Sequence, residues 1–295
     1  MRVTEFTDAE PAPRAIAVGT FDGVHLGHRE VIAGADTVLT FEPHPVAVIA
    51  PQRMPKLLTP LGRKAEIIES LGVGELIVIR FDAAFAARDA QSFVDDVLLG
   101  RLGARSVSVG ENFRFGAGAR GDASMLAADG RFEARIVPLL EIDGEIVTSS
   151  RIRSLIAAGE VAAAAILLGE PHELAGEVIG GDRRGRELGF PTANIVPPEG
   201  LACPGHGVYA CLADGVPAAV NIGVRPTFGA GRAELIEAYL IDFDGDLYGR
   251  ELRLRFLERL RGERRFETVE ALIEAMRSDV ERARVIAARA STQPA

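Results

Sequence analysis

The sequence of 295 residues contains only two cysteines, carries fewer basic residues than acidic ones and lacks a long apolar run. Cys203 and Cys211 are too few for a disulfide framework and have no neighbours that would complete a zinc site, so a reducing cytoplasm is the simplest location. The 33 basic residues against 42 acidic ones give a formal net charge of −9. This balance excludes a generic nucleic-acid-binding protein, because such proteins neutralise phosphates with an excess of basic side chains.

The longest purely apolar run, from Val161 to Leu168, is far shorter than the roughly 20 residues needed to cross a bilayer. The first residues are partly acidic and have no apolar centre, so they do not read as a secretory signal. We therefore expect no membrane partner. The composition, 47% hydrophobic and 25% charged, is that of a globular protein, and the length favours two domains.

The pattern of the sequence changes near Gly169. Before it, short apolar runs alternate with helical patterns, which predicts an α/β domain over residues 1–170 with a parallel sheet. After it, strand-like runs follow one another between turns, which predicts an antiparallel sheet or barrel over residues 171–295, followed by a helix that Thr268 caps. The expected strands are 15–18, 37–41, 76–81, 106–109, 207–213, 218–222, 235–241 and 252–256; the expected helices before the boundary are 62–71, 90–102 and 151–168.

The segment GTFDGVHLGH, from Gly19 to His28, is the densest chemical signal of the first half. It follows an expected strand and opens an expected helix, where backbone N–H groups can hold phosphate oxygens. His25 and His28, three residues apart, add donors directed at the same anion. A tight turn with exposed histidines is one alternative. A zinc site is the other, but it lacks a third ligand at a fitting spacing.

Only eight residues separate His28 from the strand expected at Thr37. Parallel strands are normally joined by a crossover of roughly ten to twelve residues or more. The helix after His28 is therefore expected to have two turns at most.

A second glycine pattern, GAGARG from Gly116 to Gly121, satisfies the dinucleotide fingerprint, and Glu141 lies 20 residues beyond it. The residues that follow do not open a long helix, and no strand–helix–strand unit surrounds them. We interpret this segment as a glycine-rich loop.

The second half contains another phosphate-binding candidate, GGDRRGRELGFPTAN, over residues 180–194. Glycines let a loop wrap closely around phosphates, and the arginines supply charge. Thr192 and Asn194, two apart, would project to the same side of an extended chain and offer neutral oxygen ligands for Mg²⁺. On composition alone, a surface turn with solvated arginines stays an open alternative.

Taken together, these segments resemble a known family. His25-Leu26-Gly27-His28 resembles the HxGH signature of the nucleotidylyltransferase superfamily, and the wider sequence is similar to the bacterial bifunctional riboflavin kinase/FAD synthetase family. The supporting segments are LTFEPHP at 39–45, LTP at 58–60 with Lys64, VGENFRFG at 109–116, TSSRIR at 148–153, PTAN at 191–194, NIGVRPTF at 221–228, and Glu237 with DFDGDLYG at 242–249.

For the first half, the resemblance implies a Rossmann-like α/β nucleotidyltransferase domain in which the FMN phosphate attacks the α-phosphorus of ATP. His25, His28 and Arg153 would be its catalytic residues, and Asn112 would help to fix the nucleotide or a metal. Ser149 and Ser150 would hold phosphates, although both could also be helix caps. The residues implied in nucleotide or phosphate binding are Gly19, Phe21, Asp22, Gly27, Asn112, Ser149 and Ser150.

For the second half, the resemblance implies a riboflavin kinase domain, an antiparallel β-barrel with a C-terminal helix. This domain would transfer the γ-phosphoryl group of ATP to riboflavin. Glu237 would accept the proton of the ribityl 5′-hydroxyl, and Thr192 and Asn194 would bind Mg²⁺. A solvated strand face is the alternative for Glu237. The phosphate-binding residues of this loop would be Gly180, Gly185, Arg186 and Gly189.

The resemblance implies ATP, riboflavin and FMN as substrates with Mg²⁺ as cofactor, and the acidic net charge predicts no nucleic-acid partner. Two alternatives stay open. One is a riboflavin kinase whose adenylyltransferase domain is impaired by the short segment after His28, and the other is a non-catalytic regulator that binds flavin or nucleotide. The sequence does not set the oligomeric state, so a homo-oligomer stays open too.

Overall fold

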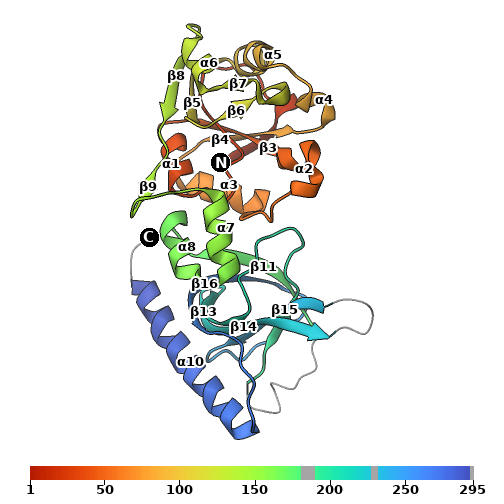
Figure 1. Cartoon of the computed structure of the whole chain (residues 1–295), viewed down its shortest axis with the longest axis vertical. Helices are drawn as coiled ribbons and strands as arrows, with labels where there is room; N and C mark the ends of the chain where they lie inside the picture. The colour runs from red at the N-terminus through yellow and green to blue at the C-terminus, as the bar shows by residue number, and fades with distance from the viewer. Residues whose placement is uncertain (181–189, 227–231, 293–295) are drawn as a thin grey trace. The chain divides into compact units, whose positions relative to one another are not determined.

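The computed structural model describes residues 1–180, 190–226 and 232–292. Its internal contacts divide the chain into two compact units, Met1–Ser149 and Ser150–Ala295 (Figure 1).

The first unit is built on a six-stranded parallel sheet in the order β1-β4-β3-β2-β5-β8. The predicted α/β domain with a parallel sheet is confirmed, and the edge strands β1 and β8 are additions that the sequence pattern did not show. The strands are β1 (Arg2–Glu5), β2 (Arg14–Val18), β3 (Thr37–Glu42), β4 (Glu75–Arg80), β5 (Ala104–Gly110) and β8 (Glu133–Val137).

Helices cover both faces of this sheet because successive strand residues point to opposite sides. Ile16 and Val18 belong to one core, which Phe93 and Val97 complete, whereas Ala17 belongs to the other core. The helical segments are η1 (Phe6–Asp8), α1 (Leu26–Ile32), α2 (Pro45–Ile49), η2 (Pro51–Arg53), α3 (Leu61–Ser70), α4 (Ala83–Ala86), α5 (Ala90–Ser92), its π-helical continuation η3 (Phe93–Arg101), η4 (Ala117–Ala119) and α6 (Ala123–Ala128). Two short hairpins complete the unit, β6 (Arg114–Phe115) with β7 (Gly121–Asp122) and β9 (Glu141–Ile142) with β10 (Glu145–Ile146).

The short crossover after His28 forms as expected. Helix α1 has seven residues, and Gly34 turns the chain back with a φ of +80°. Strand β3 still pairs with β2 in parallel, with Ile16 opposite Thr37. The strand order is therefore retained, because the loop before α1 contributes to the length of the connection.

The second unit is a closed antiparallel barrel in the order β11-β12-β15-β14-β13-β16 (Figure 1). The predicted barrel is confirmed, with two strands, β11 and β12, that were not expected. The strands are β11 (His172–Ile179), β12 (Ala193–Ile195), β13 (Gly207–Ala213), β14 (Val216–Pro226), β15 (Arg232–Leu240) and β16 (Glu251–Arg261), and the helices are α7 (Ser149–Ala158), α8 (Val161–Leu168) and α10 (Val269–Thr292).

The prediction of one helix over residues 151–168 is wrong. The chain forms α7 and α8, which are separated at Gly159, where φ is +83°. A Cβ at this position would lie 2.7 Å from the hydroxyl oxygen of Tyr209. Close packing on the barrel and a left-handed turn therefore interrupt the helix.

The predicted cap of the last helix is confirmed. The Thr268 hydroxyl oxygen accepts a hydrogen bond from the Ala271 N–H at 3.1 Å. Asp279 and Ala283 on α10 are buried, and the Asp279 carboxylate pairs with Arg261 of β16 at 2.9 Å. This ion pair and the apolar contacts around Ala283 fasten α10 to the outside of the barrel.

Candidate active sites

The Gly19–His28 loop lies where the order of the parallel sheet reverses. Strands β3 and β4 are added on one side of β2, and β5 and β8 on the other. In open α/β sheets, ligands bind outside the carboxyl ends of the two strands at such a reversal. The loop leaves the end of β2, and the turn with the exposed Asn112 leaves the end of β5, so the fold brings these two predicted segments together.

The two histidines of the loop form one stacked pair. Their ring centroids are 3.5 Å apart with planes inclined by 16°, and the edge of Phe21 approaches His28 with a centroid distance of 5.4 Å. His25 Nδ1 accepts a hydrogen bond from the His28 N–H at 3.2 Å. His28 Nδ1 is buried and has no hydrogen-bond partner among the residues that the structure describes. A buried polar atom without a partner is costly, and a ligand oxygen would satisfy it.

The charge state of this pair follows from its surroundings. Burial, together with His25 and Lys64, lowers the pKa of His28 well below 6.5, so the ring is neutral at pH 7. The buried Lys64 Nζ donates to the Thr20 carbonyl oxygen at 2.8 Å. Burial lowers the pKa of Lys64, while Asp22 and Glu42 act to raise it. Lys64 thus reaches the loop from α3, a contact that its position in the sequence does not reveal.

Four of the predicted binding residues support the loop from within. The buried Asp22 carboxylate accepts hydrogen bonds from the N–H groups of Leu58 (2.8 Å) and Thr59 (3.3 Å). A Cβ on Gly19 would lie 2.9 Å from the ring of the buried Phe21, and one on Gly27 would lie 3.4 Å from the ring of His25. These glycines leave room for the two rings, and Asp22 holds the loop to residues 58–59.

The serine and arginine candidates divide between the two units. The Ser149 hydroxyl donates to the Asp22 carbonyl oxygen at 2.9 Å, which ties Ser149 to the loop. Ser150 and Arg153 belong to the second unit, where Arg153 Nη2 donates to the Ser150 hydroxyl oxygen at 3.2 Å.

In the barrel, three polar side chains lie in one row across neighbouring strands. Asn194 of β12 is opposite Glu237 of β15, and Glu237 is opposite Asn221 of β14. Their strand neighbours Ile236 and Ala238 belong to the barrel interior, so the row faces outward. Asn221 Nδ2 donates to Glu237 Oε2 at 3.4 Å. Asn221 had no predicted role, because only the strand register places it beside Glu237.

Further polar and aromatic groups surround this row. Phe190, which directly precedes the Pro191–Asn194 segment, packs against Tyr239 with ring centroids 5.3 Å apart. A Cβ on Gly223 would lie 2.7 Å from Glu263 Oε1, and the other oxygen of Glu263 lies 3.7 Å from His206 Nδ1.

Among the phosphate-loop candidates, Gly180 is exposed, whereas Gly185, Arg186 and Gly189 lie outside the described residues.

The donor atoms near this row suit a metal ion that arrives with phosphate. Within the described ranges, no cluster of three His, Cys, Asp or Glu residues could hold a metal. Thr192 is half-buried directly before β12, and Asn194 is buried within it. A hydroxyl and an amide oxygen beside the Glu237 carboxylate fit Mg²⁺, which prefers oxygen ligands and usually keeps water and phosphate oxygens as well.

The segment Gly116–Gly121 is a glycine-rich loop, as interpreted from the sequence. It forms η4 between the short strands β6 and β7, and the helix after it has six residues. A Cβ on Gly116 would lie 2.6 Å from the Ala90 nitrogen, so this glycine allows close packing on α5.

Comparison with known proteins assigns both units. Residues 7–151 match the FAD synthetase family and residues 168–287 match the riboflavin kinase family. The bifunctional riboflavin kinase/FMN adenylyltransferase of Listeria monocytogenes is 38% identical over 302 residues, covering 97% of this chain and 95% of its own. The enzyme of Bacillus subtilis is 36% identical, and the match covers 93% of this chain and 92% of that protein. The enzyme of Escherichia coli K12 is also 36% identical, and the match covers 87% of each chain. The chain belongs to the bifunctional riboflavin kinase/FMN adenylyltransferase family.

A solved structure shows the same fold over nearly the whole chain. It is described as a macrolide-efflux protein from Streptococcus pneumoniae, is 28% identical, and covers 96% of this chain and 99% of its own with a TM-score of 0.88. The efflux activity in this description refers to that protein and not to the present chain. In the part of the present chain that the structure describes, no helix is long and apolar enough to cross a membrane.

The two family matches leave residues 152–167 between them, and these residues form most of α7 and α8. Internal contacts group both helices with the barrel. The domain boundary at residues 170 and 171 stays a prediction.

Proposed function

We propose that this chain converts riboflavin to FMN in the barrel unit and FMN to FAD in the α/β unit, with ATP as the second substrate of both steps. The observation that carries the proposal is that each unit gathers its own family motif residues at one place. The loop with His25 and His28 and the turn with Asn112 leave the carboxyl ends of the neighbouring strands β2 and β5, and Asn194 and Glu237 are paired on the barrel.

In the first step, the ribityl 5′-hydroxyl oxygen of riboflavin attacks the γ-phosphorus of ATP and ADP leaves. Glu237 accepts the hydroxyl proton, and the hydrogen bond from Asn221 orients the carboxylate. Thr192 and Asn194 hold Mg²⁺, which neutralises phosphate charge when bound. The family motif assigns phosphate binding to Gly180, Gly185, Arg186 and Gly189.

In the second step, a phosphate oxygen of FMN attacks the α-phosphorus of ATP and pyrophosphate leaves, so no covalent intermediate with the protein is needed. His25 and His28 donate to the ATP phosphates, with His28 acting as a neutral donor. Asn112 and Ser149 complete the binding of nucleotide and phosphates in this unit, and the phosphate-binding roles of Ser150 and Arg153 rest on the family motif alone. Catalysis then rests on alignment and on stabilisation of charge in the transition state.

A chromatographic product assay with riboflavin, ATP and Mg²⁺ tests both steps. The wild-type protein should accumulate FMN and then FAD. Glu237→Gln should lower FMN formation at least about 100-fold, because it removes the base, while riboflavin binding and conversion of added FMN to FAD persist. The exposed Glu251→Gln on the same barrel is the matched control and should behave as wild type.

Each contrary outcome has a defined meaning. Unchanged FMN formation by the Glu237→Gln variant would show that Glu237 is not the base. FMN without FAD from the wild-type protein would favour the kinase-only alternative, and binding without any product would favour the regulator.

The proposal includes Mg²⁺ as cofactor, the cytoplasm as location and small molecules rather than nucleic acid as partners. A chelator should abolish both steps and added Mg²⁺ should restore them. Both cysteines are free, which agrees with a reducing compartment. Light scattering of the purified protein would decide between a monomer and a homo-oligomer.

A further inference from the structure

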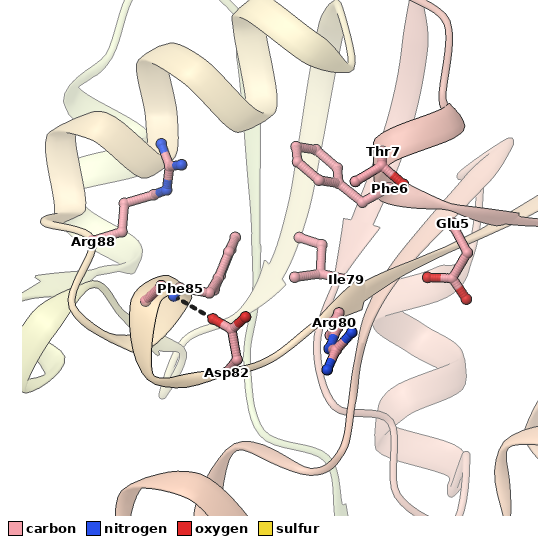
Figure 2. Close-up of a pocket in the computed structure, with 9 residues that line it drawn as sticks. Glu5, Phe6, Thr7, Ile79, Arg80, Asp82, Phe85 and Arg88 are labelled. Carbon is pink, nitrogen blue, oxygen red and sulfur yellow. Dashed lines mark hydrogen bonds between the residues drawn. The ribbon is translucent and has the colours of Figure 1, made fainter.

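A cavity lies in the first unit, away from the reversal of the sheet. Its volume is about 490 Å³, and it opens at the carboxyl ends of β1 and β4 (Figure 2). The order β1-β4-β3-β2-β5 places strand β3 between this cavity, at β1 and β4, and the crevice at β2 and β5. The cavity is therefore separate from the loop that carries His25 and His28, and the proposed function does not use it.

The floor and walls of this cavity are apolar and aromatic. Ile79, at the end of β4, is 1% exposed. Phe6 of η1 and Phe85 of α4 are partly buried, and both pack against the same core as Ile79. Figure 2 shows Phe85 to the left of Ile79, the ring of Phe6 above it and Glu5 to the right. A planar ring that enters between η1 and α4 would contact both phenylalanines.

Four charged side chains line the rim, and they differ in whether they already have a partner within the protein. Arg88 pairs with Asp96 at 2.7 Å and its guanidinium lies 5.8 Å from the Phe85 centroid. The Asp82 carboxylate caps α4 by accepting the Phe85 N–H at 2.8 Å. Arg80 and Glu5 are exposed, and neither side chain makes a hydrogen bond or ion pair with any residue that the structure describes. One cation and one carboxylate thus remain to meet a ligand.

We propose that this cavity binds a planar aromatic ring that carries a phosphate, a ligand the size of a nucleoside monophosphate. The ring packs over Ile79 between Phe6 and Phe85, the phosphate pairs with Arg80, and Glu5 accepts from an amino or hydroxyl group of the ligand. The volume lies within the roughly 300–1,000 Å³ typical of small-molecule sites. Apolar walls with a few polar groups at the rim are the usual composition of such sites.

AMP is the probe for this site. Calorimetric titration of the full chain, with a non-hydrolysable ATP analogue and riboflavin present at saturation, should show one further AMP bound per chain. Adenosine and inorganic phosphate, which each lack one half of the ligand, should bind at least tenfold more weakly. No AMP binding under these conditions would overturn the proposal.

Two variants locate the AMP. Arg80→Gln should weaken its binding at least tenfold, and Phe6→Leu should weaken it while keeping the core contact apolar. Arg105→Gln is the control, since Arg105 is an exposed arginine near the amino end of β5, whereas Arg80 lies at the carboxyl end of β4. AMP binding that is equal in the wild type and in Arg80→Gln would place the ligand elsewhere and refute the proposed site. FMN formation by Arg80→Gln should be unchanged, which separates this site from the kinase.

Discussion

At the scale of single residues, the row Asn194–Glu237–Asn221 shows how a barrel positions a carboxylate. Glu237 alternates with the interior residues Ile236 and Ala238, so strand geometry directs it outward. The amide of Asn221 then donates to it across the strand pair. The carboxylate is held by the register of three strands and not by its neighbours in sequence.

Asn221→Asp should slow riboflavin phosphorylation at pH 7 by roughly tenfold, because it replaces the donor to Glu237 by a second negative charge beside the carboxylate and the ATP phosphates. Asn221→Ala removes the donor without adding charge and should cause a smaller loss. The initial rate of FMN formation measures both. Conversion of FMN to FAD by the same variants is the internal control and should keep its rate. Equal rates of FMN formation by the Asp and Ala variants would refute the role of Asn221.

His172 should make the barrel sensitive to acid. It is 2% exposed, and burial lowers its pKa to about 4, although the hydrogen bond from Nε2 to the Ala202 carbonyl oxygen (2.9 Å) acts in the opposite direction. Between pH 6.5 and 4, the unfolded chain binds a proton that the folded barrel does not. Stability is therefore lost as the pH falls through this window, by about 3 kcal/mol from this group.

Urea unfolding at pH 7 and pH 4 measures this effect. His172→Gln keeps a donor but does not titrate, so its stability should fall less between the two pH values than that of the wild type. Equal losses in the two proteins would show that His172 does not cause the acid sensitivity.

At the scale of elements, the break between α7 and α8 is set by one glycine. Gly159→Ala should destabilise the barrel unit by about 2–4 kcal/mol, because the methyl group meets Tyr209 and Arg259 and the residue must keep a positive φ. Gly215→Ala is the matched control. Its φ is +86° but nothing lies within 4 Å of the added Cβ, so only the conformational cost of about 1 kcal/mol applies. Urea unfolding of both variants measures the difference, and equal losses would contradict the packing argument.

At the scale of the whole molecule, the two units carry separate chemistry. The Glu237→Gln variant should convert FMN to FAD but should form almost no FMN from riboflavin. The His28→Asn variant should convert riboflavin to FMN but should form no FAD. Mixing the two variants should restore conversion of riboflavin to FAD, because FMN released by one protein is a substrate for the other. Absence of FAD from the mixture would show that FMN does not pass between separate chains.

The chemistry of the sites was largely accessible from the sequence. Residue types at short spacings show the Gly19–His28 and Pro191–Asn194 segments directly, whereas the role of Glu237 comes from the family resemblance and stays a prediction. Strands with strong apolar patterns, such as β3 and β13, were also predicted within one or two residues. Hydrophobic periodicity reports how one segment faces its core, and this local property sets the fold class.

Other features depend on pairing between distant segments. The mostly exposed β1 has little apolar pattern and is a strand because it pairs with β4. The stacking of His25 on His28, the contact of Lys64 with Thr20 and the register of Asn221 with Glu237 all require the packed structure. The cavity between η1 and α4 is likewise absent from any one segment. Residue spacing along the chain determines which groups are available, whereas packing of distant segments determines which of them meet, because contacts between distant residues depend on strand register and close packing.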